Sequence, residues 1–148
     1  MEIKEFLSPE AVVFIPKENT PSKKDLLRLV AEIASNVYGL DLESSFAALE
    51  EREMASSTGM GQGIALPHAR SDDYEHIVGI FVRLESPIEF DSIDRKPVDL
   101  VFGMFAPNNS SIEYLKSLSG VARKLREEET QQFLRSTVEP KEILSILT

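Results

Sequence analysis

Residues 98–106 read VDLVFGMFA, an almost unbroken apolar run. A second run of this kind, IVGIFVRL, spans residues 77–84. Such runs are typical of interior strands that helices cover on both faces, because neither side of the strand meets water. The two runs therefore predict an α/β domain in which a central sheet lies between layers of helices.

The 148 residues fit one domain, over residues 1–148, with a mixed sheet of about five strands in a three-layer arrangement. A first strand is expected at residues 11–15. Residues 64–66 predict a short buried strand whose end presents His68, and residues 88–90 a short extended piece between the two long runs.

Helices are expected where apolar residues recur at helical spacing between start and stop signals. The first begins at residues 21–22, where Ser22 and Asp25 have the spacing of a capping box, and Gly39 ends it. Ser110 and Glu113 have the same spacing at the start of a later amphipathic helix that ends near Arg126. The remaining helices are expected from residue 42 to just before Ser56, around residues 130–135, and around residues 141–147.

Composition excludes several classes of function. Lysine and arginine number 16 against 25 aspartates and glutamates, and the formal net charge of −9 disfavours nucleic acid as a partner. The chain has no cysteine, which excludes disulfides, thiolate metal sites and a cysteine nucleophile. Its first residues lack a secretion signal, and no segment approaches the length of a membrane span. We therefore expect a soluble, cytoplasmic protein with no direct membrane insertion.

A Gly-rich segment, STGMGQG at residues 57–63, leads into IALPH and places His68 behind a proline. A neutral imidazole presents a nucleophilic nitrogen, and an ordinary pKa of about 6.5 leaves most of it neutral at neutral pH. The pattern favours nucleophilic or acid/base chemistry at His68, with an ordinary loop histidine as the alternative. The second histidine, His76, is expected to cap the strand that follows it. Two histidines without thiols form no typical metal set, and the glycine spacing is not that of a dinucleotide loop, so neither metal nor cofactor is expected.

Two blocks of the chain carry a family resemblance. Residues 51–53 (ERE) and 57–68 (STGMGQGIALPH) resemble the phosphohistidine signature of the type-2 EIIA domains of the bacterial phosphoenolpyruvate-dependent sugar phosphotransferase system. That family includes the fructose and mannitol EIIA domains and the nitrogen-regulatory EIIA protein. A second block, within residues 97–107 and 114–116, resembles the same family, so the two blocks together span most of the chain.

The resemblance implies a function for His68. In the family, the histidine of the Pro-His pair accepts a phosphoryl group from the phosphocarrier HPr and passes it to an EIIB domain. We therefore expect this chain to act as a phosphotransferase component, with an HPr-like protein as donor and an EIIB domain or a regulatory protein as target. A phosphorylation-dependent binding module without a role in sugar transport is the alternative, and a relative that is never phosphorylated is a third. Sugar identity is not readable from this chain.

Further site residues are expected around His68. The planar fork of Arg52 suits phosphate oxygens, and the loop of Thr58, Gly59, Gly61 and Gly63 offers N–H donors. Tyr114 stands where several family members carry a second histidine; a phenol donates a hydrogen bond but is not a cation at neutral pH. Other interpretations stay open: Arg52 pairs with a nearby carboxylate, the glycines only shape a turn, and Tyr114 is a half-buried helix residue.

Overall fold

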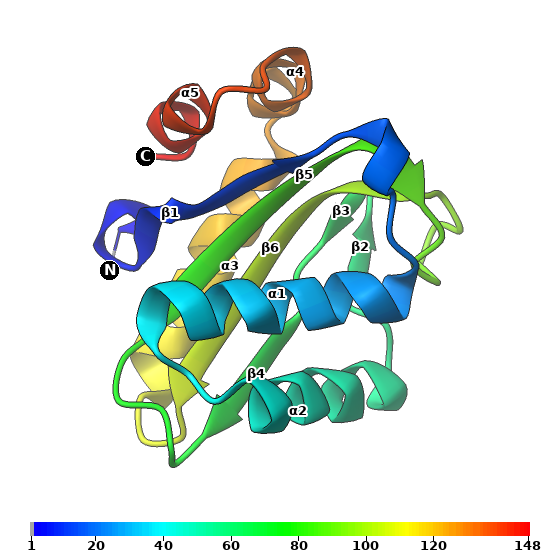
Figure 1. Ribbon diagram of the computed structural model, residues 1–148. Coiled ribbons are helices and arrows are strands. Elements are labelled where there is room, and N and C mark those ends of the chain that lie inside the picture. The colour runs from blue at the N-terminus through cyan, green and yellow to red at the C-terminus, as the bar shows by residue number, and fades with distance from the viewer. Residues whose placement is uncertain (1) are drawn as a thin grey trace.

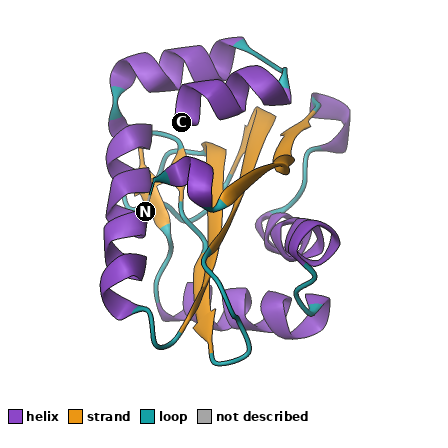
Figure 2. Cartoon of the chain, turned by 90° about the vertical axis from the view of Figure 1, so that its left-hand side faces the viewer, coloured by secondary structure: helices purple, strands orange, loops and turns teal. Residues whose placement is uncertain are grey.

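A mixed six-stranded sheet forms the middle layer of the computed structural model, which describes residues 2–148 (Figure 1). Helices α1 and α2 cover one face of the sheet and α3 the other, as the perpendicular view in Figure 2 also shows. The expected three-layer α/β arrangement is therefore confirmed. The strands are β1 (Leu7–Ile15), β2 (Gly59–Gly61), β3 (Ile64–Ala65), β4 (His68–Ser71), β5 (Val78–Ile88) and β6 (Val98–Pro107). The helices are α1 (Lys23–Tyr38), α2 (Leu42–Ala55), α3 (Ser111–Arg126), α4 (Glu128–Ser136) and α5 (Pro140–Leu147), with short 3₁₀ turns at Ile3–Glu5 and Lys17–Asn19.

The two apolar runs form the antiparallel pair β5 and β6 at the centre of the sheet. The strand order is β1-β5-β6-β3-β2, and β1 runs parallel to β5 while β3 runs parallel to β6. Large side chains of this pair, among them Phe81, Phe102 and Phe105, are fully buried. The hydrophobic core therefore lies around β5 and β6, the two strands that the apolar runs predict.

The sheet has six strands rather than about five because two short strands, β3 and β4, pair one after the other with the same edge of β6. Ile64 lies opposite Leu100 in the register of β3, and His68 lies opposite Met104 in that of β4. Pro67 stands between the two pieces and has no N–H to donate, although its carbonyl accepts from the N–H of Met104 at 3.0 Å. The short buried strand expected at residues 64–66 is confirmed as β3, but His68 does not simply follow its end, because His68 begins a separate strand.

Two strand boundaries also differ from expectation. β1 begins at Leu7 rather than at residue 11, although Ser8 and Pro9 are poor strand formers. β1 is an edge strand with an irregular register between Leu7 and Val12, and such positions tolerate proline. The extended piece expected at residues 88–90 is absent within the described residues, because β5 itself continues to Ile88.

Helix α1 begins and ends as expected. The hydroxyl oxygen of Ser22 accepts a hydrogen bond from the N–H of Asp25 at 3.1 Å, and Gly39 ends the helix with φ of 75°. A β-carbon at Gly103 on β6 would lie 2.5 Å from Cγ1 of Val30, so the glycine lets α1 approach the sheet closely. This close approach sets the distance between the first layer and the second.

Substitution of Gly103 by alanine is expected to destabilise the fold by about 1–3 kcal/mol, because the added methyl overpacks the contact with Val30. Urea unfolding followed by circular dichroism measures the change. Gly120 on α3 has open space around it, so Gly120→Ala serves as the matched control and should stabilise the protein by about 0.5–1 kcal/mol. Equal effects of the two substitutions would contradict the proposed contact.

The C-terminal part differs from expectation in one cap. The hydroxyl of Ser110 donates to the carbonyl of Pro107 at 2.8 Å and makes no bond to the first turn of α3, so the expected capping box with Glu113 does not form. α4 and α5 confirm the two short helices, and α5 lies against β1 (Figure 1).

His76 is exposed in the loop that precedes β5. None of the helices within residues 2–148 has the length and apolar character needed to cross a membrane.

Candidate active site

One ring nitrogen of His68 is engaged in a hydrogen bond with the backbone. Its Nδ1 lies 2.6 Å from the carbonyl oxygen of Leu66. A carbonyl only accepts hydrogen bonds, so Nδ1 carries the proton in the neutral ring and Nε2 keeps its lone pair. The backbone two residues earlier thus selects the tautomer in which Nε2 is the unprotonated nitrogen.

The surroundings keep this ring neutral. Burial lowers the pKa of His68 below its ordinary value of 6.5, and the charges of Arg52 and Arg70 act in the same direction. The hydrogen bond to Leu66 and the charge of Glu53 oppose the shift without reversing it. At neutral pH the ring is therefore uncharged, and the lone pair of Nε2 is free without a separate base.

The midpoint of His68 protonation in the folded protein is expected below pH 6.5, because burial lowers the pKa of the ring. An unfolded histidine takes up its proton at the ordinary pKa, so the lowered pKa costs stability as the pH falls below that value. Two-dimensional proton–nitrogen NMR of the side chain tests this, with the signals of exposed His76 as an internal reference. The Nδ1–H tautomer should be seen above pH 6.5; an Nε2–H tautomer or a pKa above 6.5 would contradict the geometry.

His68 opens onto a cleft of about 490 Å³ between α2, β4 and α3. Arg52 from α2, Arg70 from β4 and Tyr114 from α3 line this cleft together with His68. The expectation that Arg52 lies near His68 in space agrees with this arrangement. Two cations and the carboxylate of Glu51 therefore face the same space as the ring of His68.

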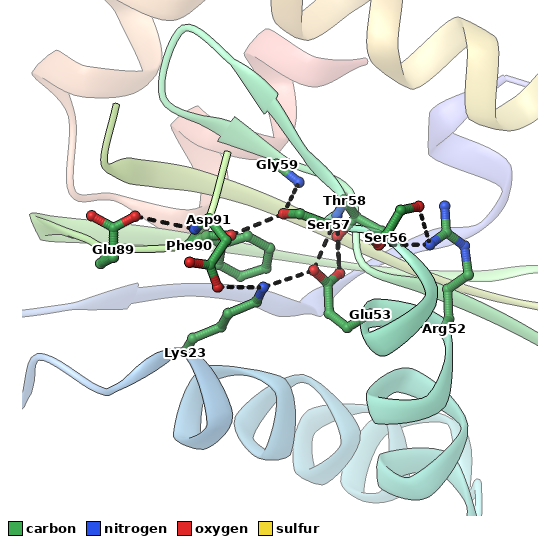
Figure 3. A network of polar contacts seen from close by, with 10 residues as sticks. All are labelled: Lys23, Arg52, Glu53, Ser56, Ser57, Thr58, Gly59, Glu89, Phe90 and Asp91. Atoms are coloured by element: carbon green, nitrogen blue, oxygen red, sulfur yellow. Dashed lines mark hydrogen bonds and ion pairs between the residues drawn. The ribbon is translucent and has the colours of Figure 1, made fainter. Parts of the chain in front are cut away.

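Arg52 lies in the last turn of α2, and the chain after the helix holds its side chain. Its Nη1 donates to the carbonyl oxygen of Ser56 at 2.8 Å and contacts the Ser56 hydroxyl at 3.3 Å (Figure 3). Within residues 2–148, Arg52 forms no ion pair, so pairing with a neighbouring carboxylate is not observed. Its other guanidinium donors are available to an anionic ligand in the cleft.

A buried carboxylate organises the segment that follows Arg52. Both oxygens of Glu53 accept from the N–H of Thr58, and one also accepts from the Thr58 hydroxyl (Figure 3). Nζ of Lys23, at the start of α1, lies 3.0 Å from Glu53 and 3.3 Å from Asp91. Both donors of Thr58, a predicted phosphoryl-binding residue, are therefore occupied by protein.

The glycines of the loop have two different places. Gly59 lines a groove of about 310 Å³ that is shared with Thr58, Arg52 and His68, and its N–H donates to the Ser57 hydroxyl at 3.1 Å. Gly61 and Gly63 line neither this groove nor the cleft. They belong to the β2–β3 hairpin, where Gln62 and Gly63 have φ of 60° and 79°, as a type I′ turn requires. The structure thus brings Thr58 and Gly59 close to His68 but not Gly61 or Gly63.

Tyr114 is buried against the cleft, with 5% of its surface exposed. Its ring centroid lies 6.1 Å from that of His68, and the guanidinium carbon of Arg70 lies 4.9 Å from the Tyr114 ring centroid. Burial raises the pKa of the Tyr114 phenol, so it stays neutral at neutral pH. The ring is therefore both part of the wall beside His68 and a platform for Arg70.

Sequence reasoning missed Glu53, Arg70 and Arg126. Arg70 is two residues after His68, and alternate residues of a strand share a face, so a strand beginning at His68 would have indicated it. Arg126 ends α3 and lines the same groove as Gly59, a proximity that only the packing of α3 creates. Glu53 offers no signal beyond its place in the motif.

Within residues 2–148 no three His, Asp or Glu side chains cluster as a metal site would require.

Comparisons with known proteins agree over nearly the whole chain. The family model described as "Phosphoenolpyruvate-dependent sugar phosphotransferase system, EIIA 2" matches residues 5–148. A nitrogen regulatory protein of Bradyrhizobium diazoefficiens is 37% identical over 147 residues, which cover 99% of this chain and 95% of that protein. The crystal structure of nitrogen regulatory protein IIA-Ntr from Neisseria meningitidis matches with a TM-score of 0.91 at 33% identity and covers 99% of each chain.

A more distant structure shares the fold alone. Mannitol IIA from Escherichia coli matches with a TM-score of 0.79 at 22% identity, over 95% of this chain and 98% of that one. The mannitol enzyme IIA has also been solved as a complex with phosphorylated mannitol enzyme IIB.

Proposed function

Because the chain belongs to the EIIA type-2 family of the phosphoenolpyruvate-dependent sugar phosphotransferase system, we propose that it carries a phosphoryl group on Nε2 of His68. One observation carries the proposal: Nδ1 is bound to the Leu66 carbonyl, which leaves the lone pair of Nε2 free in a ring that lines an arginine-containing cleft. The low pKa of His68 supports it, since the ring stays uncharged when the donor arrives.

The transfer needs a placed nucleophile and charge stabilisation rather than covalent help from other groups. The lone pair of Nε2 attacks phosphorus in line with the donor nitrogen, a P–N bond forms, and the bond to the donor breaks. The electron pair leaves with the donor ring, while the proton of His68 stays on Nδ1, hydrogen-bonded to the Leu66 carbonyl oxygen. Arg52 binds the oxygens of the migrating group through the donors that Ser56 does not use.

In this proposal Arg52 binds the phosphoryl group, and the segment of Thr58 and Gly59 lies beside it. Because Thr58 already donates to Glu53, we assign Thr58 to shaping the segment and leave the binding of phosphate oxygens to side chains in the cleft. Gly61 and Gly63 are assigned to the hairpin turn that leads to His68. Tyr114 takes part as a wall of the cleft.

The donor that we propose is an HPr-like phosphocarrier, and the acceptor an EIIB domain or a regulatory target. The complex of mannitol enzyme IIA with phosphorylated enzyme IIB supports an EIIB acceptor for a chain of this fold. The relatives at 37% and 33% identity are nitrogen regulatory proteins, and this favours the regulatory branch over sugar transport. The second candidate is therefore a binding module that phosphorylation switches, through the added negative charge, without passing the group onward.

Incubation with phosphoenolpyruvate, enzyme I and HPr tests the proposal. One acid-labile phosphoryl group should appear, and intact-mass spectrometry with peptide mapping should place it on His68. A protein that stays unmodified under these conditions, while a known EIIA domain is phosphorylated in parallel, would refute it. Pull-downs with the unmodified and the phosphorylated protein then separate the branches: a changed set of partners supports the switch, and fast transfer to an EIIB domain supports the carrier.

Arg52→Gln is expected to slow phosphorylation of His68 at saturating donor by roughly 10- to 100-fold, because it removes charge-assisted hydrogen bonds worth about 1.5–3 kcal/mol. Rapid-quench single-turnover kinetics measure the rate. Arg123→Gln makes the same change of charge on an exposed part of α3 outside both the cleft and the groove, so it serves as the control. Equal rates for the two variants would remove Arg52 from the site.

A further inference from the structure

We propose that Arg70 is a second phosphoryl-binding residue and that Tyr114 positions its guanidinium at the cleft by stacking. The inference rests on the proposed phosphorylation of His68. Arg70 is not among the site residues predicted from the sequence.

The strand places Arg70 on the same side as the nucleophile. His68 and Arg70 are the first and third residues of β4, and alternate residues of a strand point to the same face of the sheet. Both side chains line the cleft, which the end of α2 also borders. Ala69 between them is buried. β4 is held in place by its parallel pairing with β6, so the two side chains have a fixed relation to each other.

The ring of Tyr114 holds the guanidinium near His68. The guanidinium carbon of Arg70 lies 4.9 Å from the ring centroid of Tyr114, a cation–π distance. The imidazole of His68 lies 6.1 Å from the same ring, so both groups are neighbours of one buried aromatic side chain. Tyr114 itself stays neutral, and therefore the positive charge on this wall of the cleft comes from Arg70.

The other contacts of Arg70 are weak enough to be exchanged. Its Nη1 donates to the hydroxyl of Ser111 at 3.4 Å, near the upper limit for a hydrogen bond. Within residues 2–148 no carboxylate forms an ion pair with it. A guanidinium with these partners can turn towards an anion without the loss of a strong interaction.

The charge of the product calls for a second cation. A phosphoryl group carries a charge of about −1.5 to −2 at neutral pH, as phosphorylated side chains do. Arg52 contributes one positive charge from the α2 side, and Arg70 contributes another from the β4 side. In the transfer, Nε2 of His68 forms the new P–N bond as the bond to the donor histidine breaks, and the two guanidinium groups bind the phosphoryl oxygens throughout.

Single-turnover transfer from phosphorylated HPr tests the proposal in the full chain. At saturating donor, Arg70→Gln should slow the transfer by roughly 10- to 100-fold. Arg70→Lys should be intermediate, since it keeps the charge but not the bidentate fork. Arg123→Gln, which removes an exposed charge on α3 away from the cleft, controls for long-range effects on the approach of the donor.

The role of Tyr114 has its own readout. Tyr114→Leu removes the stacking surface, and its effect on the transfer rate should not add to that of Arg70→Gln in a double-mutant cycle. Tyr114→Phe keeps the ring and should slow the transfer less than Tyr114→Leu does. Circular dichroism and thermal unfolding establish that each variant is folded before its rate is used.

Two results would overturn the inference while leaving the proposed function intact. One is phosphorylation of His68 at the same saturated rate in Arg70→Gln as in Arg123→Gln. The other is an NMR spectrum of the phosphorylated protein in which the guanidinium signals of Arg70 are unchanged from the unphosphorylated form. By contrast, a lack of phosphorylation in the unsubstituted protein would refute the proposed function itself.

Discussion

His68→Ala is expected to abolish phosphorylation of the protein completely. The methyl group that remains has no lone pair, and neither the arginines nor the tyrosine of the cleft can replace Nε2 as a nucleophile at neutral pH. Arginine stays protonated, and the phenol of Tyr114 stays neutral because burial raises its pKa. The second histidine, His76, is exposed in the loop before β5 and lines neither the cleft nor the groove. Incubation with phosphorylated HPr followed by intact-mass analysis measures the loss.

The fold should survive this substitution. His68 is only partly buried, and its one hydrogen bond joins Nδ1 to a carbonyl two residues away. The backbone of β4 keeps its pairing with β6 whatever the side chain. His76→Ala is the matched control and should be phosphorylated at the rate of the unchanged protein. A phosphoryl group found on His68→Ala would mean that the carrier atom lies elsewhere.

Glu53→Ala is expected to lower the free energy of unfolding by about 2–4 kcal/mol. The carboxylate of Glu53 is 5% exposed, and without it the N–H and hydroxyl of Thr58 lose their acceptor in a buried place. Lys23 is 23% exposed and keeps Asp91 as a partner, so the loss is smaller than for a fully buried ion pair. The corresponding fall in melting temperature is roughly 5–15 °C.

Thermal and urea unfolding measure this effect. Glu53→Gln should lose less than Glu53→Ala, because an amide oxygen still accepts from Thr58 while the pairing with Lys23 is weakened. Glu50→Ala removes a carboxylate of α2 that forms no ion pair within residues 2–148, and its effect should stay within about 0.5 kcal/mol. If Glu53→Ala were as stable as Glu50→Ala, the network of Figure 3 would have no role in stability.

The catalytic consequence of Glu53→Ala follows from the same contacts. Glu53 holds Thr58, and the segment between them includes Ser56, to which Arg52 donates. Loss of this anchor should loosen Arg52 and slow transfer at temperatures where the variant is still folded.

Several parts of the fold were predictable from local patterns. The apolar runs at residues 77–84 and 98–106 became β5 and β6 because a buried strand needs apolar side chains on both faces. Ser22 and Gly39 bounded α1 because caps act on their own helix end. These signals depend on neighbours within a few residues, and so they can be read before the chain is folded.

Other parts depended on contacts between distant segments. β1 reaches back to Leu7 only because β5 lies beside it and accepts a strand with a proline at the edge. The capping box expected at Ser110 does not form, because the Ser110 hydroxyl donates to the carbonyl of Pro107 instead. Gly61 and Gly63 share the motif with His68, but the hairpin turn carries them away from it.

The sequence by itself determined the class of fold, the family and the choice of His68 as the candidate nucleophile, since periodicity and the Pro-His motif are local properties. Only the tertiary structure decided which ring nitrogen is free, which arginines face it and which glycines do not. The reason is that α2, β4 and α3 meet at the cleft through packing against the sheet, so Arg52, Arg70 and Tyr114 become neighbours of His68 only when the layers assemble.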